Sequence, residues 1–333
     1  TLSNVEKLKF SDKTVTLESG VRRSGTSGVD SLSGSDGADV LDGLGGADVL
    51  NSGLGNDTLL GGDGDDVIAV AASIDDWIDS KKLTALATAT TTANLQVQAG
   101  DGDDIVYVGT LFSQNSSMTG GRGTDILILG DPPDSYGKQS DLSGVSGFEI
   151  INLAGTKTYS SSIYSLPDFA SSWYPWGTYS LNFSLTNANL ADLTKPLEVF
   201  FRAMSNRTLD ASAVTNLGIR FLSQGGIGSG TVALGSQAAD TYLALGDASD
   251  DQFKGNGGDD NYDGGAGIDT AIYAGLWENY TIATTNDGKT VVTAKTGNEG
   301  SDTLSNVEKL KFSDKTVTLE SGVRRSGTSG VDS

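Results

Sequence analysis

A nine-residue pattern of glycine, aspartate and one large apolar side chain constrains the fold of this chain more than any other feature. From Gly34 the sequence reads GSDGADVLD, GLGGADVLN, SGLGNDTLL and GGDGDDVIA in direct succession. The sixth residue of each copy is aspartate, and the eighth is leucine or isoleucine. A flexible linker does not place a large apolar residue at every ninth position, so the pattern predicts regular structure.

Further copies of the nonapeptide follow in two places. AGDGDDIVY and GGRGTDILI begin at residues 99 and 120, and GNGGDDNYD and GGAGIDTAI begin at residues 255 and 264, just after Asp251. The degenerate copy GSQAADTYL begins at Gly235, where Ser236 and Ala238 replace two glycines. Its aspartate, Asp240, is therefore a weaker candidate ligand than the aspartates of the other copies. Spacings of 21 residues from Asp104 to Asp125 and of 11 from Asp240 to Asp251 require bulged coils.

The residue types of the nonapeptide suit a cation-binding turn. Glycine at positions one, two and four permits positive φ and lets backbone carbonyls turn inward. Aspartate is a poor helix former, and its short carboxylate is a hard oxygen ligand of the kind that calcium prefers. The large apolar residue at position eight then points into a core.

The pattern GGxGxDxUx resembles the calcium-binding nonapeptide of RTX (hemolysin-type) proteins. The resemblance implies an all-β fold: a right-handed parallel β-roll or β-solenoid in which two nonapeptides form one coil. Turns on one edge then recur at every second nonapeptide, so Asp39 stacks on Asp57 and Asp48 on Asp66. It also implies several Ca²⁺ ions, type I secretion and an extracellular or cell-surface location. The implied ligands are the aspartate side chains and glycine carbonyls of these turns: Asp39, Asp48, Asp57, Asp66, Asp104, Asp125, Asp251, Asp260 and Asp269, with Gly34, Gly37, Gly43, Gly46, Gly53, Gly55, Gly62, Gly64, Gly100, Gly102, Gly121, Gly123, Gly255, Gly258, Gly265 and Gly267.

Composition excludes several classes of function. The net charge of −21 argues against nucleic-acid partners and anionic membrane surfaces. The chain has neither cysteine nor histidine, which removes disulfides, Ser-His-Asp catalysis and thiolate metal sites. We find no apolar run long enough to cross a bilayer as a helix, and we expect no membrane span. We expect no enzyme, although carboxylate chemistry on glycans stays formally open.

A second, much longer repeat joins the two ends of the sequence. Residues 1–31 recur without change as residues 303–333, so the copies start 302 residues apart. We interpret this as one period of a tandem array plus an overlap into the next period. An engineered duplication of the ends is the alternative.

The segments outside the nonapeptides also carry structural signals. SIDDWIDSKKLTALA, near residues 73–87, predicts a short helix with Ser73 as N-cap. GFEIINLAG, LEVFFRAM and GTVAL predict strands. The segments GFEIINL and TLDASAV resemble the solenoid coils that interleave with calcium repeats in large RTX surface proteins. The aromatic stretch SSWYPWGTYSLNF is either a loop that covers the core or a sugar-stacking platform.

The segment from Asp269 to Leu319 resembles a module common in large RTX proteins, DTxxYxGxxxxYxI…VTxxxGxEGxDTLxNVExLxF. It predicts a β-hairpin that turns at Asn286, Asp287 and Gly288. The predicted organisation has five parts: the end of a preceding repeat at 1–31, a calcium-binding β-roll at 32–130 with the helical insertion, a calcium-poor solenoid at 131–234, a second calcium-binding roll at 235–272 and a hairpin junction module at 273–333.

Three classes of function follow from these features. The first, which we favour, is a calcium-stabilised structural repeat of a long secreted bacterial adhesin, surface filament or sheath. Its partners are neighbouring copies of the same 302-residue repeat, with surface glycans or other cells as open targets. The alternatives are an S-layer-type surface protein and the non-catalytic calcium-binding region of a secreted polysaccharide-active enzyme.

Overall fold

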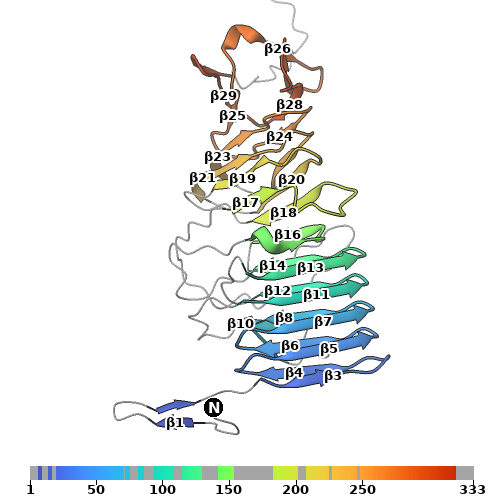
Figure 1. Ribbon diagram of the computed structural model, residues 1–333. Helices are drawn as coiled ribbons and strands as arrows, with labels where there is room; N and C mark the ends of the chain where they lie inside the picture. Colours follow the sequence, from blue (N-terminus) through green and yellow to red (C-terminus); the bar gives the residue numbers. More distant parts are fainter. Residues whose placement is uncertain are drawn as a thin grey trace, which may run out of the picture.

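Stacked parallel strands form an elongated body (Figure 1) in the computed structural model of the chain. The structure describes residues 7–9, 14–16, 20–70, 72–75, 82–85, 94–108, 115–129, 142–153, 183–201, 208–224, 227–245 and 248–319. Within these ranges each coil contributes one strand to each of two opposite faces. The parallel β-solenoid expected from the nonapeptides is therefore present.

One sheet runs the full length of the stack. Its order is β26-β27-β28-β24-β22-β20-β18-β16-β14-β12-β8-β6-β4 among the described residues, and we call it the long sheet. Its strands are β4 (Ser31–Ser35), β6 (Val49–Gly53), β8 (Val67–Val70), β12 (Ile105–Val108), β14 (Ile126–Leu129), β16 (Ile150–Asn152), β18 (Leu197–Phe201), β20 (Ile219–Gln224), β22 (Thr241–Leu245), β24 (Asn261–Asp263), β26 (Tyr280–Thr284), β27 (Thr290–Ala294) and β28 (Ser301–Ser305).

The opposite face consists of two shorter sheets. The first has the order β15-β13-β11-β7-β5-β3, and the second has the order β17-β19-β21-β23-β25-β29-β30. The first contains β3 (Arg22–Ser24), β5 (Val40–Gly45), β7 (Thr58–Asp63), β11 (Gln96–Asp101), β13 (Ser117–Arg122) and β15 (Val145–Ser146). The second contains β17 (Phe183–Thr186), β19 (Thr208–Ala213), β21 (Ile227–Leu234), β23 (Ala248–Lys254), β25 (Thr270–Ile272), β29 (Lys309–Lys311) and β30 (Thr316–Thr318).

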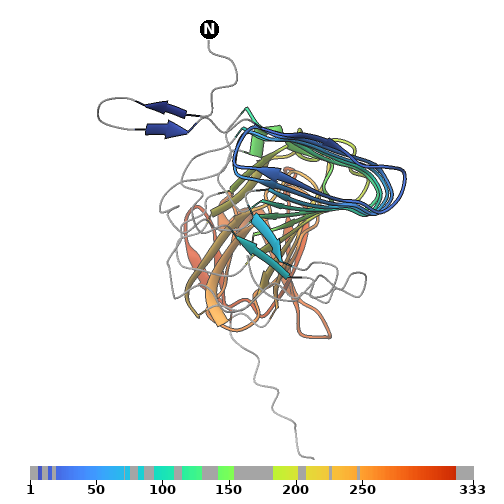
Figure 2. The same cartoon turned by 90° about the horizontal axis from the view of Figure 1, so that it is seen from below.

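The spacing of the nonapeptide sets the register of the first coils. β4 pairs with β6 and β6 with β8 at offsets of two nonapeptides, as in Leu32↔Leu50 and Leu50↔Ile68. Viewed along the stack, these coils superpose as a narrow flattened loop (Figure 2). Strands of period two send alternate side chains inward. The eighth residues of the nonapeptides are accordingly fully buried: Leu41, Leu50, Leu59 and Ile68.

The calcium-poor coils have a core of larger side chains. Phe148, Phe201 and Phe221 are buried there, beside Leu197 and Val199. All of them belong to one continuous apolar cluster that also contains the leucines of the first coils. The predicted strands in GFEIINLAG, LEVFFRAM and GTVAL are confirmed as β16, β18 and the end of β21.

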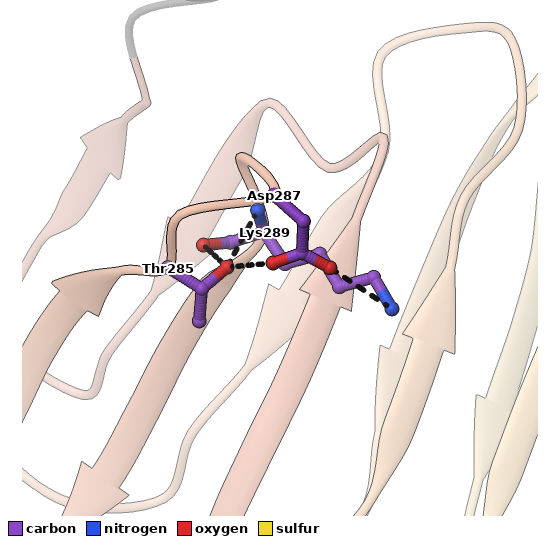
Figure 3. Close-up of polar contacts among 3 residues, drawn as sticks. All are labelled: Thr285, Asp287 and Lys289. Carbon is purple, nitrogen blue, oxygen red and sulfur yellow. Dashed lines mark hydrogen bonds and ion pairs between the residues drawn. The ribbon is translucent and has the colours of Figure 1, made fainter.

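Antiparallel hairpins end both faces near residue 319. On the long sheet, β26 and β27 pair through a turn in which Thr285 Oγ1 contacts Asp287 and Lys289 Nζ lies 3.7 Å from Asp287 Oδ2 (Figure 3). The hairpin predicted at this turn is therefore confirmed. On the other face, β29 and β30 pair antiparallel, with Leu310 opposite Val317.

The 31-residue repeat forms the same hairpin at both ends of the chain. β1 (Lys7–Lys9) and β2 (Thr14–Thr16) pair in the register Leu8↔Val15, which the second copy of the repeat reproduces as Leu310↔Val317. β29 also pairs with β25, whereas β1 pairs only with β2 among the described residues and lies apart from the stack (Figures 1 and 2). This local pairing therefore does not depend on a neighbouring coil.

The predicted helix near residues 73–87 is wrong. The described parts of this segment are two antiparallel strands, β9 (Ala72–Asp75) and β10 (Lys82–Ala85). A helix of about 15 residues is marginal by itself, and tertiary context overrides weak propensity. The described helices are only two three-residue 3₁₀ turns, η1 (Leu142–Gly144) and η2 (Trp277–Asn279). The aromatic stretch before Phe183 lies outside the described residues.

Candidate calcium sites

Except for Asp251, which lies within β23, the predicted aspartates lie directly before strands, at turns along the edges of the solenoid. On the long sheet, each one binds the next through its backbone. Asp48 N donates to Asp66 Oδ1 at 2.7 Å, Asp66 N to Asp104 Oδ1 at 2.7 Å, and Asp104 N to Asp125 Oδ1 at 3.0 Å. We call these four residues the aspartate column. Its carboxylates are held in line even where 38 residues separate neighbours.

The other turns repeat this contact. Asp39 N donates to Asp57 Oδ1 at 3.0 Å, so both predicted stacks, Asp39 on Asp57 and Asp48 on Asp66, are confirmed. In the later coils, Asp240 N donates to Asp260 Oδ1 and Asp251 N to Asp269 Oδ1, each at 2.8 Å. Each of the nine predicted aspartates is buried.

The second oxygen of most of these carboxylates has no hydrogen-bond partner. This holds for Oδ2 of Asp48, Asp57, Asp66, Asp104, Asp125, Asp260 and Asp269. A buried carboxylate oxygen without a partner is costly, because burial removes its hydration. These atoms therefore call for a ligand that the polypeptide does not supply.

The space beside the first glycine of each turn is lined by oxygen atoms. A Cβ atom added to Gly43 would lie 2.4 Å from Asp48 Oδ2 and 2.4 Å from the carbonyl oxygen of Gly61. At Gly61 it would lie 2.4 Å from Asp66 Oδ2 and 2.1 Å from the carbonyl oxygen of Ala99. The described residues contain no group of three or more acidic side chains that would form a metal site alone. Single carboxylates combined with backbone carbonyls are the donor set that suits Ca²⁺.

In most of these turns, the residue at position two of the nonapeptide has a positive φ. Gly62 has φ 116°, and a Cβ there would lie 2.4 Å from the carbonyl oxygen of Leu44. Leu44 and Asn256 adopt φ 73° and 72° at the equivalent positions, a conformation that non-glycine residues rarely adopt. At Leu44 and Asn256 the backbone thus keeps the conformation that glycine has in the other copies.

Burial of several carboxylates in one column changes their ionisation. In the absence of a cation, desolvation raises the pKa of Asp66, Asp104 and Asp125 to about 7. In the later coils it raises the pKa of Asp260 and Asp269 to about 8, and neighbouring carboxylates add to the shift. A bound divalent cation would reverse this effect by favouring the charged forms.

The structure adds residues that the sequence interpretation missed. Asp30 and Asp302 occupy the same position in the columns, since Asp30 N donates to Asp48 Oδ1 and Asp260 N donates to Asp302 Oδ1. The signal was present in the nonapeptides GTSGVDSLS and GNEGSDTLS, which keep the glycines at positions one and four. Asp240 lies in the same column as Asp260 and Asp302, and its Oδ1 accepts a hydrogen bond from Ile219 N at 2.5 Å.

Glutamate ends two of the columns. Asp125 N donates to Glu149 Oε2 and Asp269 N donates to Glu308 Oε2, each at 2.8 Å. Both glutamates follow a short segment without the glycine-rich turn, SGF and SNV. The longer side chain thus accepts the hydrogen bond that the next aspartate would otherwise accept.

Comparison with known families agrees with this geometry. A model of the RTX calcium-binding nonapeptide repeat in four copies matches residues 24–59, 49–75 and 244–271. The chain contains RTX calcium-binding nonapeptide repeats. RTX nonapeptide repeats bind several Ca²⁺ ions per set, and they are typically structural elements of secreted proteins. A search among curated proteins finds no significant match.

The match also bears on the turns described above. Its first range begins before Gly25, so it includes the nonapeptide of Asp30.

Among the described residues, none of the helices has the length and apolar character needed to cross a bilayer.

Proposed function

We propose that this RTX repeat protein is a calcium-stabilised structural unit of a tandem array in a long secreted bacterial adhesin, surface filament or sheath. The observation that carries the proposal is the 31-residue identity between the two ends. The same sequence forms the β1–β2 hairpin before the first coil and the β29–β30 hairpin after the last.

The arrangement of elements supports a linear assembly. The antiparallel pairs β27–β28 and β29–β30 end the parallel stacking on both faces. The sequence that follows β30 is the copy of the one that leads from β2 into β3 and β4, the first strands of the stack. A neighbouring repeat would therefore begin its own roll directly after the junction module at residues 273–333. We retain the division into two calcium-binding rolls, a calcium-poor solenoid and a junction as part of the proposal.

Calcium supplies the stiffness of such an array. Each coil has a narrow apolar face that is buried only when neighbours stack on it. The columns of buried carboxylates oppose stacking until a cation neutralises them, so binding and coil formation are coupled. Extracellular calcium, unlike cytosolic calcium, reaches the range in which such modules typically bind.

Small-angle scattering of chains with one and two periods of the long repeat tests this role. In millimolar calcium the maximum dimension should roughly double from one period to two, and the cross-section should stay constant. With a chelator, both chains should become shorter in contour and more flexible. A two-period chain that folds back on itself, or that forms flat sheets, would instead favour a surface-layer role.

A further inference from the structure

Ten of the described turns fall into two structural classes, distinguished by the residue at position two of the nonapeptide; the turn of Asp302, with Asn298 at that position, belongs to neither. In one class, which we call the positive-φ turns, this residue has φ between 72° and 134°. The second class, which we call the hydroxyl turns, has threonine or serine at position two, with no positive φ. The positive-φ turns are those of Asp48, Asp57, Asp66, Asp104, Asp125, Asp260 and Asp269, and the hydroxyl turns are those of Asp30, Asp39 and Asp240.

In the hydroxyl turns, the residue at position two of the nonapeptide donates two hydrogen bonds to the carboxylate of the aspartate at position six. The two bonds go either to both carboxylate oxygens or to the same one. Ser35 N donates to Asp39 Oδ2 at 2.6 Å, and Ser35 Oγ donates to Asp39 Oδ1 at 2.9 Å. Ser236 makes the same two contacts with Asp240, at 2.6 and 2.9 Å. The three turns therefore share one hydrogen-bonded motif, which Thr26 completes at Asp30 with contacts of 2.6 and 2.8 Å to Oδ2.

The same hydroxyl oxygen also fixes the rest of its turn. It accepts a hydrogen bond from the residue two positions later, at 3.1 Å from Gly37 N and 3.0 Å from Ala238 N. Asp39 Oδ1 further accepts from Val21 N at 2.6 Å. Each carboxylate oxygen of Asp39 thus already has a donor directed at it, whereas Oδ2 in the positive-φ turns has none.

We propose that serine or threonine at position two completes the turn in place of calcium, so that the turns of Asp30, Asp39 and Asp240 stay free of metal. An N–H group and a cation compete for the same lone pairs. Without an ion, the hydroxyl turns provide donors to both carboxylate oxygens of Asp39 and Asp240 and to Oδ2 of Asp30. The residue at position two is then the specificity determinant: positive φ with no donor gives a calcium site, and a hydroxyl gives a closed turn.

The hydroxyl turns lie where each series of calcium turns begins. Asp30 and Asp39 precede Asp48 in the first roll, and Asp240 follows Ile219, the last aliphatic residue at this position before the second roll. Each roll therefore begins with a turn that is complete without an ion. Coils that do require calcium can stack on this preformed end.

Calcium counting on the whole chain tests the assignment. Equilibrium dialysis with radioactive calcium at saturation should show about one additional ion per chain for Ser35→Gly and again for Ser236→Gly. Ser35→Thr is the matched control, because Thr26 already serves this role, and its count should equal that of the parent. Circular dichroism in calcium shows that each variant has folded.

A second pair of variants removes the aspartate itself. Asp39→Asn should leave the number of bound ions unchanged, while Asp66→Asn should lower it by about one. Unchanged counts in both folded Ser→Gly variants, or the loss of an ion from Asp39→Asn, would overturn the proposal. The inference rests on calcium binding by the RTX repeats and not on the array, so scattering from two-period chains and ion counting can fail independently.

Discussion

One position in the long sheet carries a carboxylate in the calcium rolls and an aliphatic side chain between them. The register leads from Asp125 to Glu149, then to Leu197 and Ile219, and returns to Asp240. Leu197 and Ile219 have no exposed surface, like the aspartates they replace. The same stack of coils therefore accommodates either a carboxylate or an aliphatic side chain at this position.

The difference shows what calcium replaces. Between the rolls, aliphatic residues at this position join a core enlarged by phenylalanines such as Phe201 and Phe221, so hydrophobic burial holds the coils. In the first roll, the eighth residues of the consecutive nonapeptides are the smaller Leu41, Leu50, Leu59 and Ile68, and the residue before each of their strands is a buried aspartate. A cation that links turn to turn compensates there for a smaller core. Four variants and conditions test this comparison.

Placing a carboxylate in the aliphatic part should have the largest effect. Ile219→Asp buries a charge with no oxygen-lined cradle prepared for an ion, and we expect a loss of about 3–5 kcal/mol in unfolding free energy. Urea denaturation in calcium measures it. The control Ile219→Val should cost about 0.5–1.5 kcal/mol. Equal stability of the two variants would show that this position tolerates either chemistry.

Removing a carboxylate from the aspartate column should mainly change the calcium requirement. Asp66→Ala removes a candidate ligand and the acceptor for Asp48 N. A loss of about 1–3 kcal/mol corresponds to a roughly 5- to 150-fold change in the folding equilibrium constant, which raises the calcium midpoint of folding. Circular dichroism during a calcium titration follows this midpoint. The exposed neighbour Asp63 is the control, and Asp63→Ala should leave the midpoint unchanged. An unshifted midpoint for Asp66→Ala would remove Asp66 from the candidate ligands.

Acid should partly substitute for calcium. The folded, cation-free pKa of Asp66 is about 7 and that of Asp260 about 8, above their ordinary 3.8. The folded state therefore binds more protons than the unfolded state, and cation-free stability falls as pH rises from about 4 to 8. We expect the calcium-free chain to have more β structure at pH 5.5 than at pH 8, and calcium binding to release protons. A calcium-free β signal that increases with pH would contradict this sign.

Neutralising the glutamate that ends the aspartate column, without removing its acceptor oxygen, should show the smallest effect. Glu149→Gln keeps an oxygen that can accept from Asp125 N, so the change should stay within about 1 kcal/mol. Glu149→Ala leaves that buried N–H without its acceptor and should cost about 1–3 kcal/mol. Thermal unfolding in calcium compares them. If Glu149→Gln were the more damaging variant, the glutamate charge itself would be required, as in a metal ligand.

The sequence was most informative where a fixed spacing determines the structure. The stacks of Asp39 and Asp48 follow from the nonapeptide period alone, and the hairpin turn at Asp287 follows from its turn residues. The strand pair at Ala72–Asp75 and Lys82–Ala85 was missed because local helix periodicity was weighed without the tertiary partner. Glu149 and Glu308 were missed because their place in the columns depends on long-range register, which spans 24 and 39 residues.

Hydrogen exchange with and without calcium tests the central claim most directly, because it compares both regions within one molecule. We expect amides of residues 40–70 to lose protection in chelator and to regain it on calcium addition. Those of residues 197–222 should change far less, because their coils are held by apolar packing. Equal protection of both regions with and without calcium would contradict the account, since the aspartate columns would then be stable without a cation.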